Sequence, residues 1–263
     1  MSLPDRVTSR IHQLWDELAD FDAAQPDSSL DHLLTGLCEL VNGQNAIWFA
    51  GVRMPQAGPN DPFSGWRPKG KHALRAFKNE REMERFVDKR VREGKVDLTT
   101  IRNVSFAGRL RANRLADLVP DDWFQGDFYQ QMYRRFDLGD AIWAGCPVNV
   151  DAEVYIGVYR HLGEPCFTER DRDAVEAALR GLKWFHHRQL LNRGIIIADA
   201  PLTRTERRVL TELLTGGSEK EVADQLGHSP HTTHDYVKSI YRKFGVSNRA
   251  ALMGLWLGAS GGG

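Results

Sequence analysis

The chain has 263 residues, a length that allows two domains of ordinary size, each with its own hydrophobic core. Its 35 Lys and Arg residues balance its 35 Asp and Glu residues, and 41% of all residues are hydrophobic, as in ordinary globular proteins. No apolar run is long enough for a membrane span, and Met1 leads into a polar stretch that does not resemble a signal peptide. We therefore expect a cytoplasmic protein with no membrane partner. Cys38, Cys146 and Cys166 are odd in number and far apart, which argues against a disulfide framework.

The first fifty residues predict two helices and a strand. Apolar residues at helical spacing predict a helix from Pro4 to about Phe21, and a leucine-rich second helix is expected to begin near Ser28. The aromatic and β-branched run 46–54 predicts a strand. The Pro- and Gly-rich stretch 55–70 that follows it predicts a loop.

The middle of the chain mixes helical and strand patterns. We expect a long charged helix over 72–94 and a further helix over 121–136, while the stretch between them gives no clear pattern. Residues 141–149 and 153–161 predict two strands joined as a hairpin.

A long helix and a hinge follow the hairpin. Thr168 and Asp171 have the spacing of a helix cap, and periodic apolar residues continue this helix to Leu190. The hinge spans 192–201, where the isoleucines 195–197 are too apolar for a free linker and are expected to dock on a domain or a second subunit. We therefore predict a sensory or regulatory domain over 1–191, a linker over 192–201 and a second domain over 202–263.

The last domain contains four short helical patterns, each with its own start. Thr203 with Glu206 and Ser218 with Glu221 have the spacing of capping boxes, in which each side chain satisfies a backbone N–H at a helix start. The third helix begins with Ser229 as N-cap and Pro230 at its first position. Ser247 is expected to cap the fourth, and glycines at 216, 217, 227 and 245 end the first three.

The third helix has two distinct faces. Its apolar side is expected to point inward, and the opposite side forms a polar stripe. The inward residues are Thr233, Val237, Ile240, Tyr241 and Phe244, and the outward residues are His231, His234, Asp235, Lys238 and Arg242.

This domain resembles the LuxR-type (GerE-like) helix-turn-helix of bacterial transcription regulators. The resemblance covers about 55 residues and rests on LTRTERRVL, GGSEKEVADQLG, SPHTTHDYVKSIYRKFGV and SNRAAL, in this order and spacing. It implies that the third helix enters the major groove of double-stranded DNA, that the second helps to hold the DNA backbone, and that the fourth contributes to a homodimer.

Carried over to this chain, the resemblance places His234, Asp235 and Lys238 opposite base edges, with His231 on the same face. Phosphate contacts give affinity without sequence information, whereas contacts to base edges specify the sequence. The candidate phosphate or positioning contacts are Lys220, Thr232, Arg242, Lys243 and Arg249.

Two features depart from the family pattern. This chain has Thr233 where valine is common, followed by His234 and Asp235 in place of a basic and a small residue. An aspartate in the groove accepts a hydrogen bond from cytosine but repels phosphate. The electrostatic footprint is also weak, because residues 202–257 contain eight Lys or Arg and six Asp or Glu.

The histidines at 228, 231 and 234 have a spacing that brings helical residues together, but no cysteine or carboxylate completes a metal site in the sequence. We also find no phosphate-binding loop, nucleophile elbow or zinc motif, so the expectation is a protein that is not an enzyme and has no metal or cofactor.

The N-terminal domain resembles PAS-like or GAF-like sensory domains, which gives an α+β fold class for the chain with an all-α four-helix domain at its end. The segments FYQQMYRRFDLGDAIWAG, VYIGVYR and GEPCFTERDRDAVEAALRGLKWFHHR are similar to the sensory halves of LuxR-type regulators. Aromatic strand residues pack in a core or line a ligand pocket. The candidate ligand-binding residues are Trp48, Trp143, Tyr155 and Tyr159.

Two functions remain open from the sequence. One is a LuxR-type transcription regulator that binds DNA as a homodimer and answers to a small-molecule signal. The alternative is a sigma-factor-like protein associated with RNA polymerase, since related helix-turn-helix units occur there.

Overall fold

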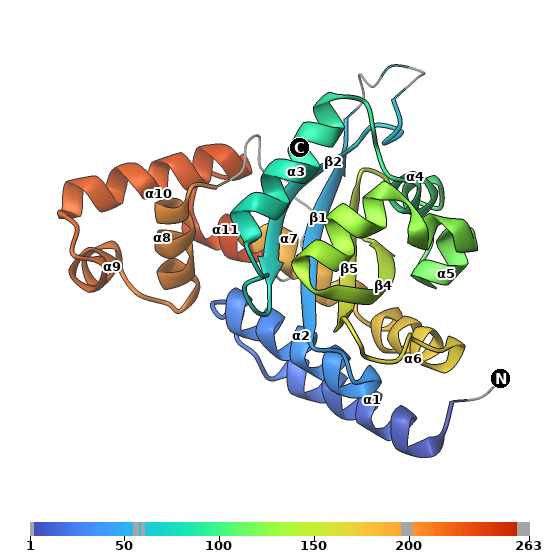
Figure 1. Ribbon diagram of the computed structural model, residues 1–263. Coiled ribbons are helices and arrows are strands. Elements are labelled where there is room, and N and C mark those ends of the chain that lie inside the picture. Colours follow the sequence, from blue (N-terminus) through green and yellow to red (C-terminus); the bar gives the residue numbers. More distant parts are fainter. Residues whose placement is uncertain (1–2, 55–57, 59–60, 196–201, 257–263) are drawn as a thin grey trace. The chain divides into compact units, whose positions relative to one another are not determined.

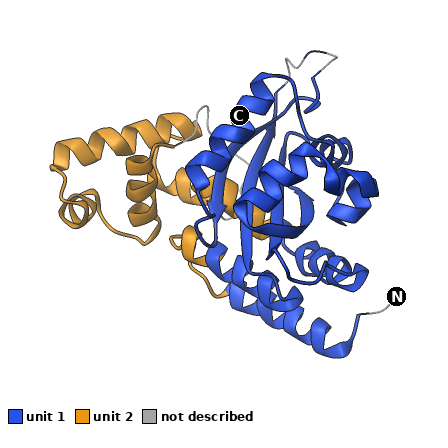
Figure 2. Ribbon diagram, viewed as in Figure 1, with its two compact units in different colours: residues 1–19, 30–183 blue, residues 20–29, 184–263 orange. Residues whose placement is uncertain are grey.

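The computed structural model describes residues 3–54, 58, 61–195 and 202–256. The chain divides into two compact units, one formed by residues 1–19 and 30–183 and the other by residues 20–29 and 184–263 (Figure 2). The second unit thus includes a helix that we predicted to belong to the N-terminal domain. Residues 196–201, which form most of the predicted linker and include Ile196 and Ile197, lie outside the described residues. The domain boundaries at 191 and 202 stay a prediction.

The first unit is built on one antiparallel sheet (Figure 1). Within the described residues this sheet has five strands in the order β2-β1-β5-β4-β3. The predicted strand at residue 46 and the predicted hairpin are confirmed, and the fold class is α+β. The strands are β1 (Asn45–Arg53), β2 (Trp66–Ala73), β3 (Arg111–Arg114), β4 (Leu138–Pro147) and β5 (Ala152–His161).

Strand β2 contradicts the predicted loop over 55–70 and also occupies the start of the helix predicted over 72–94. Among the described residues it pairs only with β1, which makes it an edge strand of the described sheet, and most of its residues are partly or fully exposed. Edge strands tolerate Pro68 and Gly70, because one side of the strand forms no ladder bonds. The pairing register shifts between Ala50 and Gly51, opposite these two residues. The sequence of β2 therefore has no alternation that would distinguish it from a loop.

The first helices of the chain match the predicted ones, whereas the later helices differ from the prediction in their bounds. The first two predicted helices are confirmed, although the second begins at Pro26 and not near Ser28. The third predicted helix is shorter, because Asn79 takes a left-handed backbone conformation with φ of 53° directly before it. The helices are α1 (Asp5–Ala19), α2 (Pro26–Val41), α3 (Glu80–Arg92), α4 (Leu98–Ser105), α5 (Leu115–Leu118) and α6 (Glu169–Arg180).

The helix predicted over 121–136 is wrong as a continuous α-helix. The segment forms a 3-10 helix (Asp121–Gln125), a π-helix (Tyr129–Tyr133) and another 3-10 turn (Arg134–Phe136). Gly126 has extended backbone and ends the first of these pieces. The aromatic residues still fall on one side, which explains their helical spacing.

The long helix predicted after Thr168 is broken into two. The capping box of Thr168 with Asp171 is confirmed at the start of α6, but this helix ends before Gly181. A Cβ at Gly181 would lie 3.0 Å from Cζ2 of Trp15, and the indole Nε1 of Trp15 donates a hydrogen bond of 2.7 Å to the carbonyl of Ala178. The close approach of α1 therefore occupies the space that a continuous helix would need.

The two faces of the sheet pack differently. One face buries Trp48, Ile142 and Ile156, which are fully buried. The other face carries an aromatic core in which Tyr159 and Ile47 contact residues from the covering helices and from 121–136. This aromatic core contains Ile47, Phe77, Leu115, Tyr129, Tyr133, Leu138, Ala141 and Tyr159, with Trp123, Phe128, Met83 and Trp143 packed against it.

A buried ion pair crosses the same face near the β3 edge. Arg111 of β3 pairs with Glu153 of β5, and both side chains are buried. The guanidinium of Arg111 passes over Gly145 of β4, where the Cβ of any other residue would collide with it. Asn103 accepts a hydrogen bond of 2.9 Å from Nε of Arg111. The pair thus ties three strands and α4 together.

The described residues of the second unit include α7 (Lys183–Asn192) from Trp184 onward and four further helices: α8 (Arg204–Leu214), α9 (Glu219–Leu226), α10 (Pro230–Phe244) and α11 (Arg249–Trp256). The side-chain amide of Asn192 accepts a hydrogen bond of 2.7 Å from the indole of Trp256 and donates one of 3.0 Å to the carbonyl of Ala23. No helix within the described part of the chain is long and apolar enough to cross a membrane.

Candidate nucleic-acid interface

Helix α8 begins as the sequence predicts and contains an additional contact. Thr203 and Glu206 form the expected capping box. Glu206 also receives hydrogen bonds from Nζ of Lys243 at 2.7 Å and from Oγ of Ser239 at 2.8 Å, both on α10. Burial alone would raise the pKa of Glu206, but the hydrogen bonds from Lys243, Thr203 and Ser239 outweigh it and lower the pKa to about 2. Glu206 is therefore a charged residue that joins α8 to α10.

The turn between α9 and α10 has the predicted chemistry. Ser218 and Glu221 form the second capping box, and Gly227 ends α9 with φ of 67°, a left-handed conformation that glycine adopts without steric cost. Oγ of Ser229 accepts a hydrogen bond of 3.0 Å from the amide of Thr232, and Pro230 is the first residue of α10. These contacts set the start of α10 relative to α9.

The two faces of α10 are those expected from the sequence. Thr233, Val237, Ile240 and Phe244 are buried, and Tyr241 is half-buried beside them. The opposite face is exposed and polar. It consists of His231, His234, Asp235, Lys238 and Arg242, with Thr232 at its edge.

The charges on this exposed face are partly paired. Nδ1 of His234 lies 2.9 Å from Oε2 of Glu219 on α9, and Nε2 of His231 lies 3.7 Å from Oδ2 of Asp235. Lys238 is exposed, and no other described residue pairs with it. The face therefore offers few free cations, as the charge count of the sequence suggested.

Two predicted phosphate contacts have structural partners. Lys243 is largely buried against Glu206. Arg249 donates a hydrogen bond of 2.7 Å to the carbonyl of Gly217 and another to the carbonyl of Leu213, so it caps the end of α8. Lys220 and Arg242 remain exposed. The DNA contacts of all four residues stay predictions. Lys220 and Arg242 are the more accessible to a phosphate, because their side chains are exposed.

The fourth helix begins differently from the expectation. Oδ1 of Asn248 accepts a hydrogen bond of 2.8 Å from the amide of Ala251, whereas Ser247 lies one residue earlier. The predicted cap at Ser247 is therefore wrong by one residue, because the asparagine side chain is the one that reaches the free amide.

Sequence reasoning missed the role of Glu219 and the second role of Glu206. The capping pattern indicated Glu206 but not its bond to Lys243, which is 37 positions away. Glu219 precedes His234 by 15 residues, and no periodic pattern connects them. Within the described ranges, no group of three or more His, Cys, Asp or Glu residues is placed to hold a metal ion.

The candidate ligand-binding residues do not converge on one point. Trp143 and Tyr159 lie together in a T-shaped contact of 5.7 Å between ring centroids, and Tyr155 lies over the same face beside Arg111. Trp48 is fully buried and belongs to the opposite face of the sheet, because side chains alternate along β1. Their role in ligand binding stays a prediction for Trp143, Tyr155 and Tyr159, and the geometry separates Trp48 from them.

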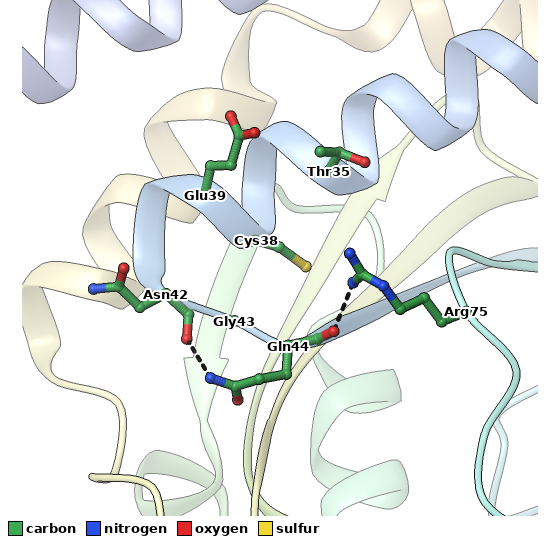
Figure 3. Close-up of a pocket in the computed structure, with 7 residues that line it drawn as sticks. All are labelled: Thr35, Cys38, Glu39, Asn42, Gly43, Gln44 and Arg75. Carbon is green, nitrogen blue, oxygen red and sulfur yellow. Dashed lines mark hydrogen bonds between the residues drawn. The ribbon is translucent and has the colours of Figure 1, made fainter.

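The first unit also has a surface pocket of about 350 Å³ at the end of α2 (Figure 3). The guanidinium of Arg75 donates a hydrogen bond of 2.7 Å to the carbonyl of Gln44 at its rim. The thiol of Cys38 lies at its floor, and burial raises the pKa of this thiol to about 11. The lining is polar and includes Thr35, Glu39, Asn42 and Gly43.

Comparison with known proteins identifies the C-terminal helices. Residues 200–255 match the family described as bacterial regulatory proteins, luxR family. This segment is a luxR-type helix-turn-helix domain. Over 52 residues the chain is 44% identical to the transcriptional regulatory protein UhpA of Escherichia coli K12, covering 20% of this chain and 26% of UhpA. It is 36% identical over 61 residues to the probable HTH-type transcriptional regulator GfsR of Streptomyces halstedii, covering 23% of this chain and 25% of GfsR.

The matched region of the luxR-type domain spans about a quarter of the length of these curated relatives. Among solved structures, Escherichia coli SdiA has a TM-score of 0.49 at 14% identity, covering 97% of this chain and 98% of SdiA. SdiA in complex with octanoyl-rac-glycerol has a TM-score of 0.48 at 14% identity, covering 99% and 98%. The VqsR LBD domain from Pseudomonas aeruginosa has a TM-score of 0.42 at 15% identity, covering 66% and 96%. Similarities of this size do not assign the first unit to a fold family.

Proposed function

We propose that this protein is a sequence-specific DNA-binding transcription regulator. The observation that carries the proposal is the exposed polar face of α10. This helix follows α9 after a capped turn, within a segment that matches the luxR family. In such domains the second helix of the motif lies in the major groove, and its outward side chains reach base edges. In this chain α10 is that helix.

The proposed contacts fall into two groups. His234, Asp235 and Lys238 face the bases, with His231 beside them, while Lys220, Thr232 and Arg242 contact phosphates or position the helix. All of these side chains are exposed. Lys243 and Arg249 act mainly through the stability of the domain, since their side chains bond to Glu206 and to the end of α8.

We further propose that the protein binds DNA as a homodimer and that the first unit, a PAS-like or GAF-like sensory domain, controls this binding in response to a small molecule. The antiparallel sheet with its aromatic core supports a sensory role, because apolar and aromatic walls are typical of small-molecule sites. Two recognition helices in a dimer would lie about one DNA turn apart, roughly 34 Å.

The test is a binding measurement with the full chain. A target sequence is first selected from random double-stranded DNA, and the affinity is then measured across salt concentrations for wild type, Lys238→Ala and Arg242→Ala. We expect each variant to lose affinity. Arg242→Ala removes a proposed phosphate contact and should also lower the slope of log affinity against log salt concentration by about one. Arg208→Ala is the matched control, because Arg208 is an exposed cation on α8 outside the proposed face. Unchanged affinity and slope in both variants would reject the assigned face.

A further inference from the structure

The contact between α9 and His234 bears on which base the protein reads. Nδ1 of His234 lies 2.9 Å from Oε2 of Glu219. A carboxylate only accepts hydrogen bonds, so the ring nitrogen that faces it must carry the proton. The contact therefore selects the tautomer of a neutral His234 with hydrogen on Nδ1.

The second ring nitrogen, Nε2, is therefore a hydrogen-bond acceptor. In a neutral imidazole with hydrogen on Nδ1, Nε2 has a lone pair and accepts a hydrogen bond. The side chain of His234 is 47% exposed, and no other described residue bonds to Nε2. An acceptor on the outward face of α10 is thus available to a partner in the groove.

The major groove presents only two kinds of amino donor, N6 of adenine and N4 of cytosine. Guanine offers two acceptors and thymine offers an acceptor and a methyl group, so neither can donate to Nε2. Lys238 lies one helical turn after His234 and carries the opposite preference, because its ammonium donates to the acceptors of guanine.

We propose that Glu219 is a positioning residue that fixes the tautomer of His234, so that His234 reads an amino-bearing base, adenine or cytosine, in the major groove. This inference rests on the proposed DNA-binding function. Glu219 itself does not touch the DNA. It acts from α9 through the ring of His234 on α10. His234 is one of the positions at which this chain departs from the family pattern.

The contact is between exposed side chains, since Glu219 is 41% exposed. Such pairs are weak in water and are strengthened when a partner excludes solvent. The expected effect of one correctly placed hydrogen bond is about threefold to tenfold in affinity between the right and the wrong base.

The first experiment concerns the free protein. The ring nitrogens of 15N-labelled histidine are observed by NMR in the full chain at pH 8.5, and the His234 signal is assigned by its loss in His234→Gln. We expect hydrogen on Nδ1 in wild type and in Glu219→Gln, whose amide oxygen accepts the same bond. In Glu219→Ala we expect a shift towards the form with hydrogen on Nε2. The Nε2–H form in wild type, or no change in Glu219→Ala, overturns the positioning role.

The second experiment selects bound sequences from random DNA with wild type and the same variants at pH 8.5, the pH of the first experiment, because a protonated imidazole would donate from both ring nitrogens. Wild type and Glu219→Gln should prefer adenine or cytosine at one position, and Glu219→Ala should lose this preference while keeping the others. Asp224→Ala is the matched control, because it removes an exposed acid from the same helix without a contact to His234. An identical base preference in wild type and Glu219→Ala overturns the proposal. If wild type selects no sequence at all, the proposed function fails, and the NMR result still decides whether Glu219 positions His234.

Discussion

Glu206 of α8 and Lys243 of α10 form an ion pair of 2.7 Å whose carboxylate is only 5% exposed. The same carboxylate caps α8 through the amide of Thr203 at 2.6 Å. One side chain therefore completes a helix start and also joins two helices of the luxR-type domain. Removing its cation leaves a buried charge with fewer partners, which is costly in a protein interior.

We predict that Lys243→Met destabilises the luxR-type domain by about 2 to 3 kcal/mol, because the hydrogen bonds from Thr203 and Ser239 offset part of the penalty for an unpaired buried carboxylate. The measurement is amide hydrogen exchange in α8 and α10 with increasing urea, since a chain with two units need not unfold in one step. Lys238→Met is the control, because Lys238 is exposed and its loss should leave the stability unchanged. Unchanged stability in Lys243→Met, combined with weaker DNA binding, would support the phosphate contact predicted from the sequence.

His186 predicts a pH dependence of stability. It is fully buried on α7, and neither ring nitrogen has a hydrogen-bond partner among the residues that the structure describes. Burial lowers the pKa of His186 from 6.5 to about 3. The unfolded chain therefore binds a proton between pH 6.5 and 3 while the folded chain does not, so stability is full above pH 6.5 and falls as the pH is lowered.

The expected slope from His186 is about 1.4 kcal/mol per pH unit within this window. Urea unfolding of wild type and His186→Leu at several pH values measures it, and the variant should show a flatter profile. His12→Leu is the control, since His12 is exposed on α1. Parallel profiles for wild type and His186→Leu would show that the histidine is not buried in the neutral form.

Gly181 gives a prediction whose sign depends on the fold. In a continuous helix Gly181→Ala would stabilise the protein by about 0.5 to 1 kcal/mol, because alanine is the better helix former. In the observed structure the added Cβ meets the indole of Trp15 at 3.0 Å. We therefore expect a destabilisation of about 1 kcal/mol from overpacking, measured by urea unfolding. In a Trp15→Leu background the same substitution should lose this penalty, and a stabilising effect in the wild-type background would favour the unbroken helix.

The three cysteines should differ sharply in reactivity. Cys166 is exposed, whereas Cys38 and Cys146 are buried. Burial also raises the pKa of the two buried thiols, to about 11 for Cys38 and about 12 for Cys146. Because the thiolate is the reactive form, we expect a disulfide reagent at pH 8 to modify one thiol per folded chain and the other two only in denaturant. Cys166→Ser should abolish the first reaction, and a second fast thiol in this variant would contradict the buried positions.

The helices of the luxR-type domain could be predicted almost completely from sequence, because the interactions that begin and end them are between residues close together in the chain. The capping pairs beginning at Thr203 and Ser218, together with Pro230, each act within four residues, and all are observed. What the sequence did not contain are contacts between helices, such as that of His234 with Glu219. These depend on how α9 and α10 pack, which periodicity does not describe.

The first unit was harder to predict because its deciding interactions are distant in the chain. Strand β2 exists through its pairing with β1, and the break after α6 exists through the approach of Trp15 from α1. The aromatic residues of 121–136 have helical spacing and pack against one core, but their backbone forms 3-10 and π turns there instead of the predicted α-helix. Local patterns identified which residues are buried better than they identified the backbone form.

The buried pair of Arg111 and Glu153 has a consequence for the solubility of the sheet. Strand β3 is a sheet edge, and free edges invite pairing with strands of other molecules. This edge has only four residues, and its first side chain is anchored across β4 to β5, so its backbone is short and held in place. An incoming strand would find few free peptide groups in register, which makes this end of the sheet a poor template for aggregation.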